Sequence, residues 1–307
     1  MISTVDGSSA KFLADLDRIQ SSLSQVQAQM SSGLRVQVPA DDPSAVTDIL
    51  QLSSSLSQST QVQTNLSIVK SRVDASESAV SSAVSLMDQL TSLAAEGANG
   101  ILSADSRAAI AQQVRSIQQQ LVAISNTSVE GRHVFSGDQP ASQAYQLNLS
   151  SPTGVTNLLP GVQATAQVQD VTGSSFTIAE TAQAIFDHVD AGGNPDASNV
   201  FAAVQSLAVA LEGNNQSGID NAVLAIKQAN SYLNTQLAFY GSVQNRVAAA
   251  VNQVNAYQVQ QKTALSARQD ADPVQDTVEL TQDQTHLQAA LAARSKLPTT
   301  SLFDYLR

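Results

Sequence analysis

The sequence has no cysteine and no tryptophan, and only 4% of its 307 residues are aromatic. The missing cysteines exclude disulfide bonds, thiolate metal sites and a cysteine nucleophile. The scarcity of aromatic residues argues against a compact core filled by large rings. Small and medium side chains dominate instead, a composition typical of long helices with small residues at their contacts.

Positive charge is also scarce. The chain has 15 lysine and arginine residues against 26 acidic ones, a net charge of -11, and it contains no basic run. Binding to the phosphate backbone of nucleic acid is therefore not expected. No apolar run approaches the roughly 20 residues that a membrane-spanning helix needs, so we expect no membrane span. The first 25 residues lack the pattern of a Sec signal peptide, which leaves other export routes open.

Residues typical of catalytic or metal chemistry are few and scattered. His133, His188 and His286 are far apart, and none has an acidic residue or a second histidine three or four residues after it; Asp283, three residues before His286, is a weak pairing. We interpret the three histidines as surface or capping residues. The sequence contains neither a Gly-x-Ser-x-Gly nucleophile elbow nor a Gly-x-x-x-x-Gly-Lys phosphate loop. It therefore predicts no enzyme, no catalytic residue, no metal site and no cofactor.

Apolar residues recur at heptad spacing near both ends of the chain. Near the start they are spaced 4, 3, 4, 3 and 4 residues apart, as Phe12, Leu16, Ile19, Leu23, Val26 and Met30. A second stripe near the end includes Leu280, Leu287 and Leu291. Such stripes predict helices that need a partner helix. We therefore expect the two ends to pair, with the rest of the chain looped out between them.

Two short segments predict helix breaks at matching places. Gly33 can adopt the left-handed conformation that ends a helix, and Pro43 suits the first position of a new helix behind Asp41 and Asp42. The same acidic signal before a proline recurs near the other end, as Asp270, Asp272 and Pro273. These carboxylates could form an acid–base pair or a calcium site, but their place before a helix favours capping. We expect the two breaks to lie level, with a hinge beside them.

Between the terminal helices the pattern predicts a bundle of long helices. One helix should run from 43 to 96, a return helix should end at Gly131, and a third long helix should follow from Ile219. Three antiparallel helices would bury their own apolar contacts.

The middle of the chain has a different character. From Val134 to about Glu180, glycine, proline, threonine and asparagine interrupt short alternating runs, which indicates a small β-rich insertion. Two short helices, at 182–189 and 200–211, should close it.

The fold class predicted is mainly α, an elongated coiled-coil-like helical bundle formed by the N- and C-terminal segments, with a small β-rich domain inserted in the middle. We expect three parts: a terminal helical assembly tier of 1–42 with 270–307, a long-helix bundle of 43–133 with 217–269, and a β-rich outer insertion with short helices, 134–216.

The terminal stripes are candidates for an assembly surface. Two helices alone, at 1–36 and 274–306, leave apolar flanks exposed, and exposed flanks of this size favour contacts with other subunits. The end adds a concentrated apolar group made of Leu302, Phe303, Tyr305 and Leu306. Alternatively, that group packs the last helix against its neighbouring helix and contacts no other subunit. The predicted assembly surface is the two stripes together with Leu302, Phe303 and Leu306.

Several motifs resemble those of the flagellin family. On the N-terminal side they are MSSGLR at 30–35, PADDP at 39–43 and GRHVFSG at 131–137. On the C-terminal side they are YGSVQNR at 240–246, DAD at 270–272 and SLFDYL at 301–306. The resemblance covers the helical portions, roughly 1–137 and 217–307, and leaves the middle unmatched.

The resemblance implies a structural subunit of the bacterial flagellum, exported unfolded through the flagellar type III apparatus on an uncleaved N-terminal signal. Its place would be outside the cell. Its implied partners are other copies of the chain, flagellar hook-associated proteins, flagellin and an export chaperone.

Two features favour the family members that join the hook to the filament. Pro43 stands where flagellins usually continue with alanine, and the ending DYL at 304–306 resembles that of the joining subunits. The function predicted is an adaptor that acts through packing of its terminal helices, with no chemical step. A filament-forming flagellin is the first alternative. A secreted coiled-coil adhesin, with the insertion as its receptor-binding head, is the second.

Overall fold

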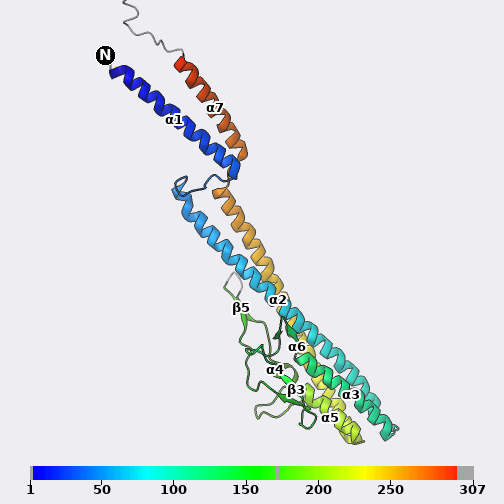
Figure 1. Ribbon diagram of the computed structural model, residues 1–307. Helices are drawn as coiled ribbons and strands as arrows, with labels where there is room; N and C mark the ends of the chain where they lie inside the picture. The colour runs from blue at the N-terminus through cyan, green and yellow to red at the C-terminus, as the bar shows by residue number, and fades with distance from the viewer. Residues whose placement is uncertain (1–2, 170–172, 296–307) are drawn as a thin grey trace, which may run out of the picture. The chain divides into compact units, whose positions relative to one another are not determined.

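The computed structural model describes residues 3–169 and 173–295, and their side chains from residue 9 onward (Figure 1). The chain divides into two compact units, residues 1–58 with 257–307 and residues 59–256. This division falls inside the two longest helices, α2 (Pro43–Gly97) and α6 (Gln216–Gln269). The architecture is mainly α with small antiparallel sheets in the middle, which confirms the predicted fold class. No helix in the described ranges is long and apolar enough to span a membrane.

The first unit contains α1 (Ser3–Ser32) and α7 (Pro273–Ser295), which pack against each other in antiparallel orientation (Figure 1). The adjoining ends of α2 and α6 complete this unit. The predicted heptad stripes thus lie on two helices that are in contact.

The second unit is built around a bundle of α2, α3 (Ala104–Ser125), α5 (Val200–Glu212) and α6. Its core includes a seven-residue repeat on α6, whose members Leu233, Tyr240, Val247 and Val254 are fully buried. Polar side chains also join α2 to α6, through the pairs Gln63–Asn255, Asp74–Gln244 and Asp88–Asn230. The long helices expected from 43 and near 219 are confirmed.

In the part of the chain that the structure describes, three two-stranded antiparallel sheets lie between residues 128 and 177, the first just before the predicted insertion of 134–216. They are β1 (Ser128–Val129) with β2 (Arg132–His133), β3 (Tyr145–Leu147) with β4 (Val155–Asn157), and β5 (Gln167–Gln169) with β6 (Ser175–Thr177). Isolated two-stranded sheets are marginal by themselves, so side-chain packing must hold the insertion together. Much of it comes from the few aromatic residues of the chain, because rings of Phe135, Tyr145, Phe186, Phe201 and Tyr240 contact one another in the core.

The return helix is shorter than the sequence predicts. We expected it to end at Gly131, and that was wrong, because α3 ends at Ser125. Asn126 stops it: its side-chain oxygen accepts from the backbone of Ala144 and Tyr145, and its amide donates to the Tyr145 carbonyl at 2.7 Å. Gly131 instead lies in the turn of the β1–β2 hairpin with a φ of 75°, a left-handed conformation that glycine adopts readily.

The short helices also differ from expectation at one end. The helix expected at 182–189 is α4 (Ala182–Phe186), which stops where Asp187 turns into the core. Burial raises the pKa of this carboxyl group, although hydrogen bonds from Asn199 and Tyr145 act in the opposite direction. The second short helix, α5, extends one residue beyond its expected end, to Glu212.

Substituting Asn126→Ala should destabilise the second unit by about 2–3 kcal/mol, because it leaves several backbone groups at the base of the insertion without partners. Urea unfolding followed by circular dichroism measures the change. Asn148→Ala is the matched control, since Asn148 is exposed and its bonds face solvent. Equal losses in the two variants would contradict the role given to Asn126.

Candidate assembly surface of the terminal helices

The helices α1 and α7 contact each other, and most residues of the predicted stripes are buried or half-buried on them. Val26 is buried at 2% exposure, and the half-buried members of the stripes are Phe12, Leu16, Ile19, Leu23, Leu280 and Leu287. The guanidinium carbon of Arg294 lies 5.6 Å from the ring centre of Phe12, which ties the far ends of the two helices. Predicted residues Leu302, Phe303 and Leu306 lie outside the described residues.

Other apolar side chains of the two helices point to solvent. Met30 is 44% exposed and Leu291 is 52% exposed, so the structure does not bring these two predicted residues into the contact. Leu13, Val274 and Val278, which our sequence analysis did not single out, are exposed by 61%, 72% and 52%. The pair of helices therefore presents apolar groups outside its own contact, as expected for a surface that other chains cover.

The contact also contains two acidic residues that sequence reasoning missed. Asp276 is only 6% exposed, and Asp283 is half-buried. One oxygen of each carboxylate, Oδ2, is buried without a hydrogen-bond partner in the described chain. The signal was available, because both residues continue the heptad spacing of Leu280 and Leu287. A carboxylate in such a place weakens the pairing of the two helices.

The two helix breaks lie side by side, which confirms that prediction. Leu34 and Asp270 form an isolated antiparallel bridge. The Ala271 amide donates to the Gly33 carbonyl at 3.0 Å, and the Arg35 amide donates to the Gln269 carbonyl at 2.7 Å. Gly33 has a φ of 73° and ends α1 in the left-handed conformation. Backbone bonds thus hold the end of α1 next to the start of α7.

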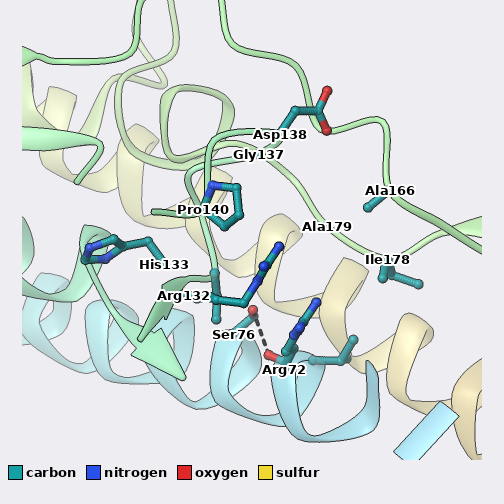
Figure 2. Close-up of a pocket in the computed structure, with 12 residues that line it drawn as sticks. Arg72, Ser76, Arg132, His133, Gly137, Asp138, Pro140, Ala166, Ile178 and Ala179 are labelled. Carbon is teal, nitrogen blue, oxygen red and sulfur yellow. Dashed lines mark hydrogen bonds between the residues drawn. The ribbon is translucent and has the colours of Figure 1, made fainter. Parts of the chain in front are cut away.

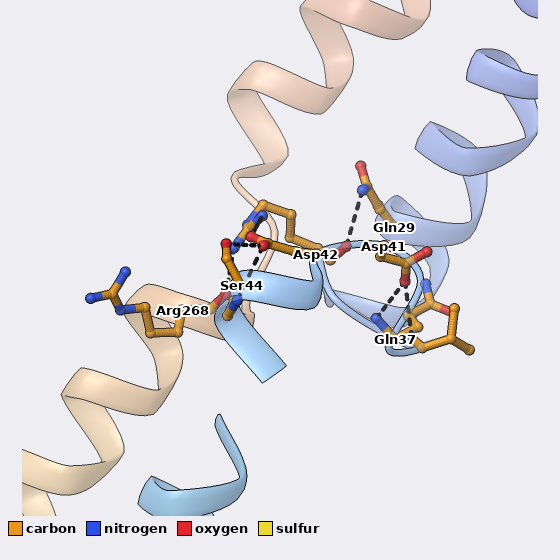
Figure 3. Close-up of polar contacts among 9 residues, drawn as sticks. Gln29, Gln37, Asp41, Asp42, Ser44 and Arg268 are labelled. Atoms are coloured by element: carbon orange, nitrogen blue, oxygen red, sulfur yellow. Dashed lines mark hydrogen bonds and ion pairs between the residues drawn. The ribbon is translucent and has the colours of Figure 1, made fainter. Parts of the chain in front are cut away.

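Arg35 is the residue that connects the parts of this joint, and sequence reasoning gave it no role. Its guanidinium donates to Asp42 Oδ2 at 2.9 Å and to the carbonyl of Arg268 at 2.7 Å. The Arg35 carbonyl in turn accepts from the Gln29 side chain, one of the contacts drawn in Figure 3. The Arg35 side chain therefore bonds the residue just before α2 and the last turn of α6.

Asp42 accepts hydrogen bonds at the start of α2. Its Oδ1 accepts from the Ser44 hydroxyl at 2.6 Å and from the Ala45 amide at 3.1 Å (Figure 3). The Ser44 bond, the Arg35 bond and the Ala45 bond, in that order of size, lower the pKa of Asp42 to about 2. Pro43 is the first residue of the helix that follows.

Asp41 binds a different segment. Its Oδ2 accepts from the amides of Val38 and Gln37, both at 2.9 Å, and these bonds lower its pKa. It therefore closes the turn before α2, whereas Asp42 binds the helix itself (Figure 3).

At the other break, too, the two acidic residues bind different segments. Asp272 Oδ1 accepts from the Val274 and Gln275 amides at 2.9 and 3.3 Å, at the start of α7, where Pro273 is the first helical residue. Asp270 accepts from the Ser266 hydroxyl on α6. Within the described part of the chain, no three acidic or histidine side chains gather in a metal-binding arrangement.

One exposed face of α7 carries a ladder of threonine hydroxyls. Thr277, Thr281 and Thr285 each donate to the backbone carbonyl four residues earlier, at 2.6, 2.9 and 2.8 Å. These hydroxyls therefore have partners within their own helix.

Comparisons with known proteins match both helical portions. Residues 3–140 match the family model of the bacterial flagellin N-terminal helical region, and residues 223–306 match that of the bacterial flagellin C-terminal helical region. Together these matches cover both terminal helices, all of α2 and α3, and most of α6.

Individual proteins agree with the family matches. The chain is 26% identical over 293 residues to flagellar hook-associated protein 3 of Escherichia coli (strain K12), covering 90% of each chain. It is 27% identical over 294 residues to flagellin FlaB1 of Treponema pallidum (strain Nichols), covering 91% of this chain and 90% of the flagellin. The crystal structure of flagellar hook associated protein-3 from Legionella pneumophila has a similar fold, with a TM-score of 0.60 and 14% identity over 71% of this chain and 98% of that one.

Acidification should loosen the joint. A carboxyl group whose pKa is lowered in the folded state stabilises the fold above its unfolded pKa, near 4, and loses this effect as pH falls through its folded pKa, about 2 for Asp42. Asp42→Asn should therefore lower the melting temperature at pH 6, and its difference from the parent should shrink between pH 4 and pH 2. Thermal melts by circular dichroism test this, with exposed Glu96→Gln as the control. A difference that stays constant down to pH 2 would be inconsistent with this role for Asp42.

Replacing a buried carboxylate should strengthen the α1–α7 contact. Asp276→Leu should stabilise the pairing by about 1–3 kcal/mol, because it removes a carboxylate whose buried Oδ2 has no hydrogen-bond partner in the described chain. Hydrogen exchange measured by mass spectrometry should show slower exchange in α1 and α7. Glu279→Leu, on the exposed face of the same helix, should leave the exchange of α1 unchanged. Faster exchange in Asp276→Leu would mean that the carboxylate has a stabilising partner.

Proposed function

The chain belongs to the flagellin family, and on that premise we propose that it is a structural adaptor joining the flagellar hook to the filament through its terminal helices. The observation that carries this proposal is the apolar surface left open on the paired helices α1 and α7, at residues such as Leu13, Val274 and Leu291. The likeness to flagellar hook-associated protein 3 of E. coli over 90% of both chains supports the junction as the place of action.

A surface of this kind suits assembly in a ring or a helix. The open apolar groups lie on a pair of different helices, and contacts between unlike patches of successive subunits either close into a ring or continue as a filament. The same chemistry could therefore serve a short junction or a long filament. The likeness to flagellin FlaB1 of T. pallidum keeps the filament as the second candidate.

In this function, residues 1–42 with 270–307 contact the neighbouring subunits. The bundle of 43–133 with 217–269 provides mechanical continuity, and the insertion, 134–216, provides the outward surface. Its partners are other copies of the chain, flagellar hook-associated proteins and flagellin, with a chaperone during export. The chain performs no chemical step, and it works outside the cell at the junction.

Electron microscopy of the purified chain with isolated hook ends tests this function. A short cap on the hook ends, with no growth of the protein alone, is the expected result. Long filaments from the same mixture would identify a filament flagellin instead. Absence of any assembly on the hook ends would contradict both candidates and move support to the adhesin.

Leu291→Asp should prevent incorporation at hook ends, because it places a charge on the open apolar surface and leaves the α1–α7 contact intact. Counting labelled subunits per hook end, with circular dichroism as a check on folding, measures the effect. Leu224→Asp is the matched control, since Leu224 is 61% exposed on α6 in the second unit. Normal incorporation of Leu291→Asp would remove Leu291 from the assembly surface.

A further inference from the structure

The second unit contains a cavity that plays no part in the proposed assembly surface. Its volume is about 290 Å³, and it lies between α2, strand β2 with the loop that follows it, and the segments beside β5 and β6 (Figure 2). Elements from both the helical bundle and the insertion therefore form its walls.

Two guanidinium groups line this cavity without partners. Arg72 on α2 and Arg132 on β2 run nearly parallel and point to the same side in Figure 2. Within the described chain neither guanidinium has an ion pair or a hydrogen bond, whereas Arg35 and Arg115 both bind carboxylates. Two unpaired arginines at one cavity stand out in a chain with a net charge of -11. Such a pair favours a planar anion that can accept from both.

The acidic residue at the cavity does not neutralise them. Asp138 accepts from the Thr165 hydroxyl at 3.0 Å and from the Thr165 amide at 3.1 Å. Its carboxylate points away from Arg132 in Figure 2. The charge of the two arginines therefore remains available to a ligand.

Backbone bonds hold the walls in place. The His133 amide donates to the Pro140 carbonyl at 2.7 Å, and the Asp138 amide donates to the Gln163 carbonyl at 2.9 Å. The His133 ring is fixed as well, because its Nδ1 lies 2.6 Å from the Asn126 carbonyl, which can only accept. Gly137 approaches the Gln163 carbonyl so closely that a Cβ atom at this position would collide with its oxygen. The cavity is therefore formed before any ligand binds.

Besides the two arginines and the polar side chains of Ser76, His133 and Asp138, the lining is apolar. Val73, Val134 and Ile178 lie beside the two arginines, so a ligand needs a short aliphatic part next to its charged group. We propose that this cavity binds a carboxylate on a short aliphatic stem, either an acidic side chain from a second copy of this chain or a small free dicarboxylate, with Arg72 and Arg132 as the binding residues.

Binding of glutarate to the full-length chain tests the site without reference to flagellar assembly. We expect saturable changes of the Arg72 and Arg132 Nε–Hε signals in NMR spectra at constant ionic strength, and at least tenfold weaker binding by Arg72→Gln/Arg132→Gln. Lys227→Gln/Lys262→Gln is the matched control, since it removes two exposed charges elsewhere. Equal binding by the parent and the arginine variant, or no saturable change in the parent, would overturn the proposal. Tighter binding of inorganic phosphate than of glutarate would overturn the carboxylate assignment.

Assembly on hook ends then distinguishes the two sources of the carboxylate. If a second copy supplies it, glutarate and the arginine variant should each raise the concentration of chain needed for assembly several-fold. If the ligand is a free dicarboxylate, glutarate should bind while assembly stays unchanged. Either result supports the site, and glutarate binding remains measurable even if the chain does not assemble on hooks.

Discussion

The contact between α1 and α7 depends on a short antiparallel backbone pairing at the two helix breaks. Leu34 opposite Asp270 sets which residue of one segment faces which residue of the other. Because α7 begins at Pro273, three residues after this bridge, the start of its apolar stripe is placed beside the end of the stripe on α1. A helix break usually interrupts a pattern, but here it aligns two patterns that lie more than 200 residues apart in the sequence.

The residues at the contact between α1 and α7 make this contact weak. Most of its apolar residues are only half-buried, and Asp276 and Asp283 place carboxylates among them. In the second unit the same kind of heptad pattern buries Leu233, Tyr240, Val247 and Val254 completely. The difference arises because two helices cover less of each other than a bundle does. Under the proposed function, neighbouring subunits would supply the burial that the pair lacks.

The sequence pattern predicted the long helices and their joint well, because heptad spacing and proline after an acidic residue are local signals. The end of α3 could not be predicted locally, since Asn126 stops the helix by binding Ala144 and Tyr145 in the insertion. Arg35 was missed for the same reason: its partner Arg268 is 233 residues away. Asp276 and Asp283 were within reach of the heptad pattern, but a search restricted to apolar residues passes over them. The arginine cavity depends on tertiary placement alone, because Arg72 and Arg132 share no motif.

The threonine ladder on α7 lets one face of this helix lie either in water or against another protein. Thr277, Thr281 and Thr285 already donate their hydroxyl hydrogens to carbonyls of their own helix. Burying a hydroxyl without a partner normally costs free energy, whereas these groups keep their bonds whatever surrounds them. Their remaining surface is largely methyl, so this face of α7 can leave water for a protein neighbour with little loss of hydrogen bonding. It is polar by residue type and close to apolar in the way it can pack.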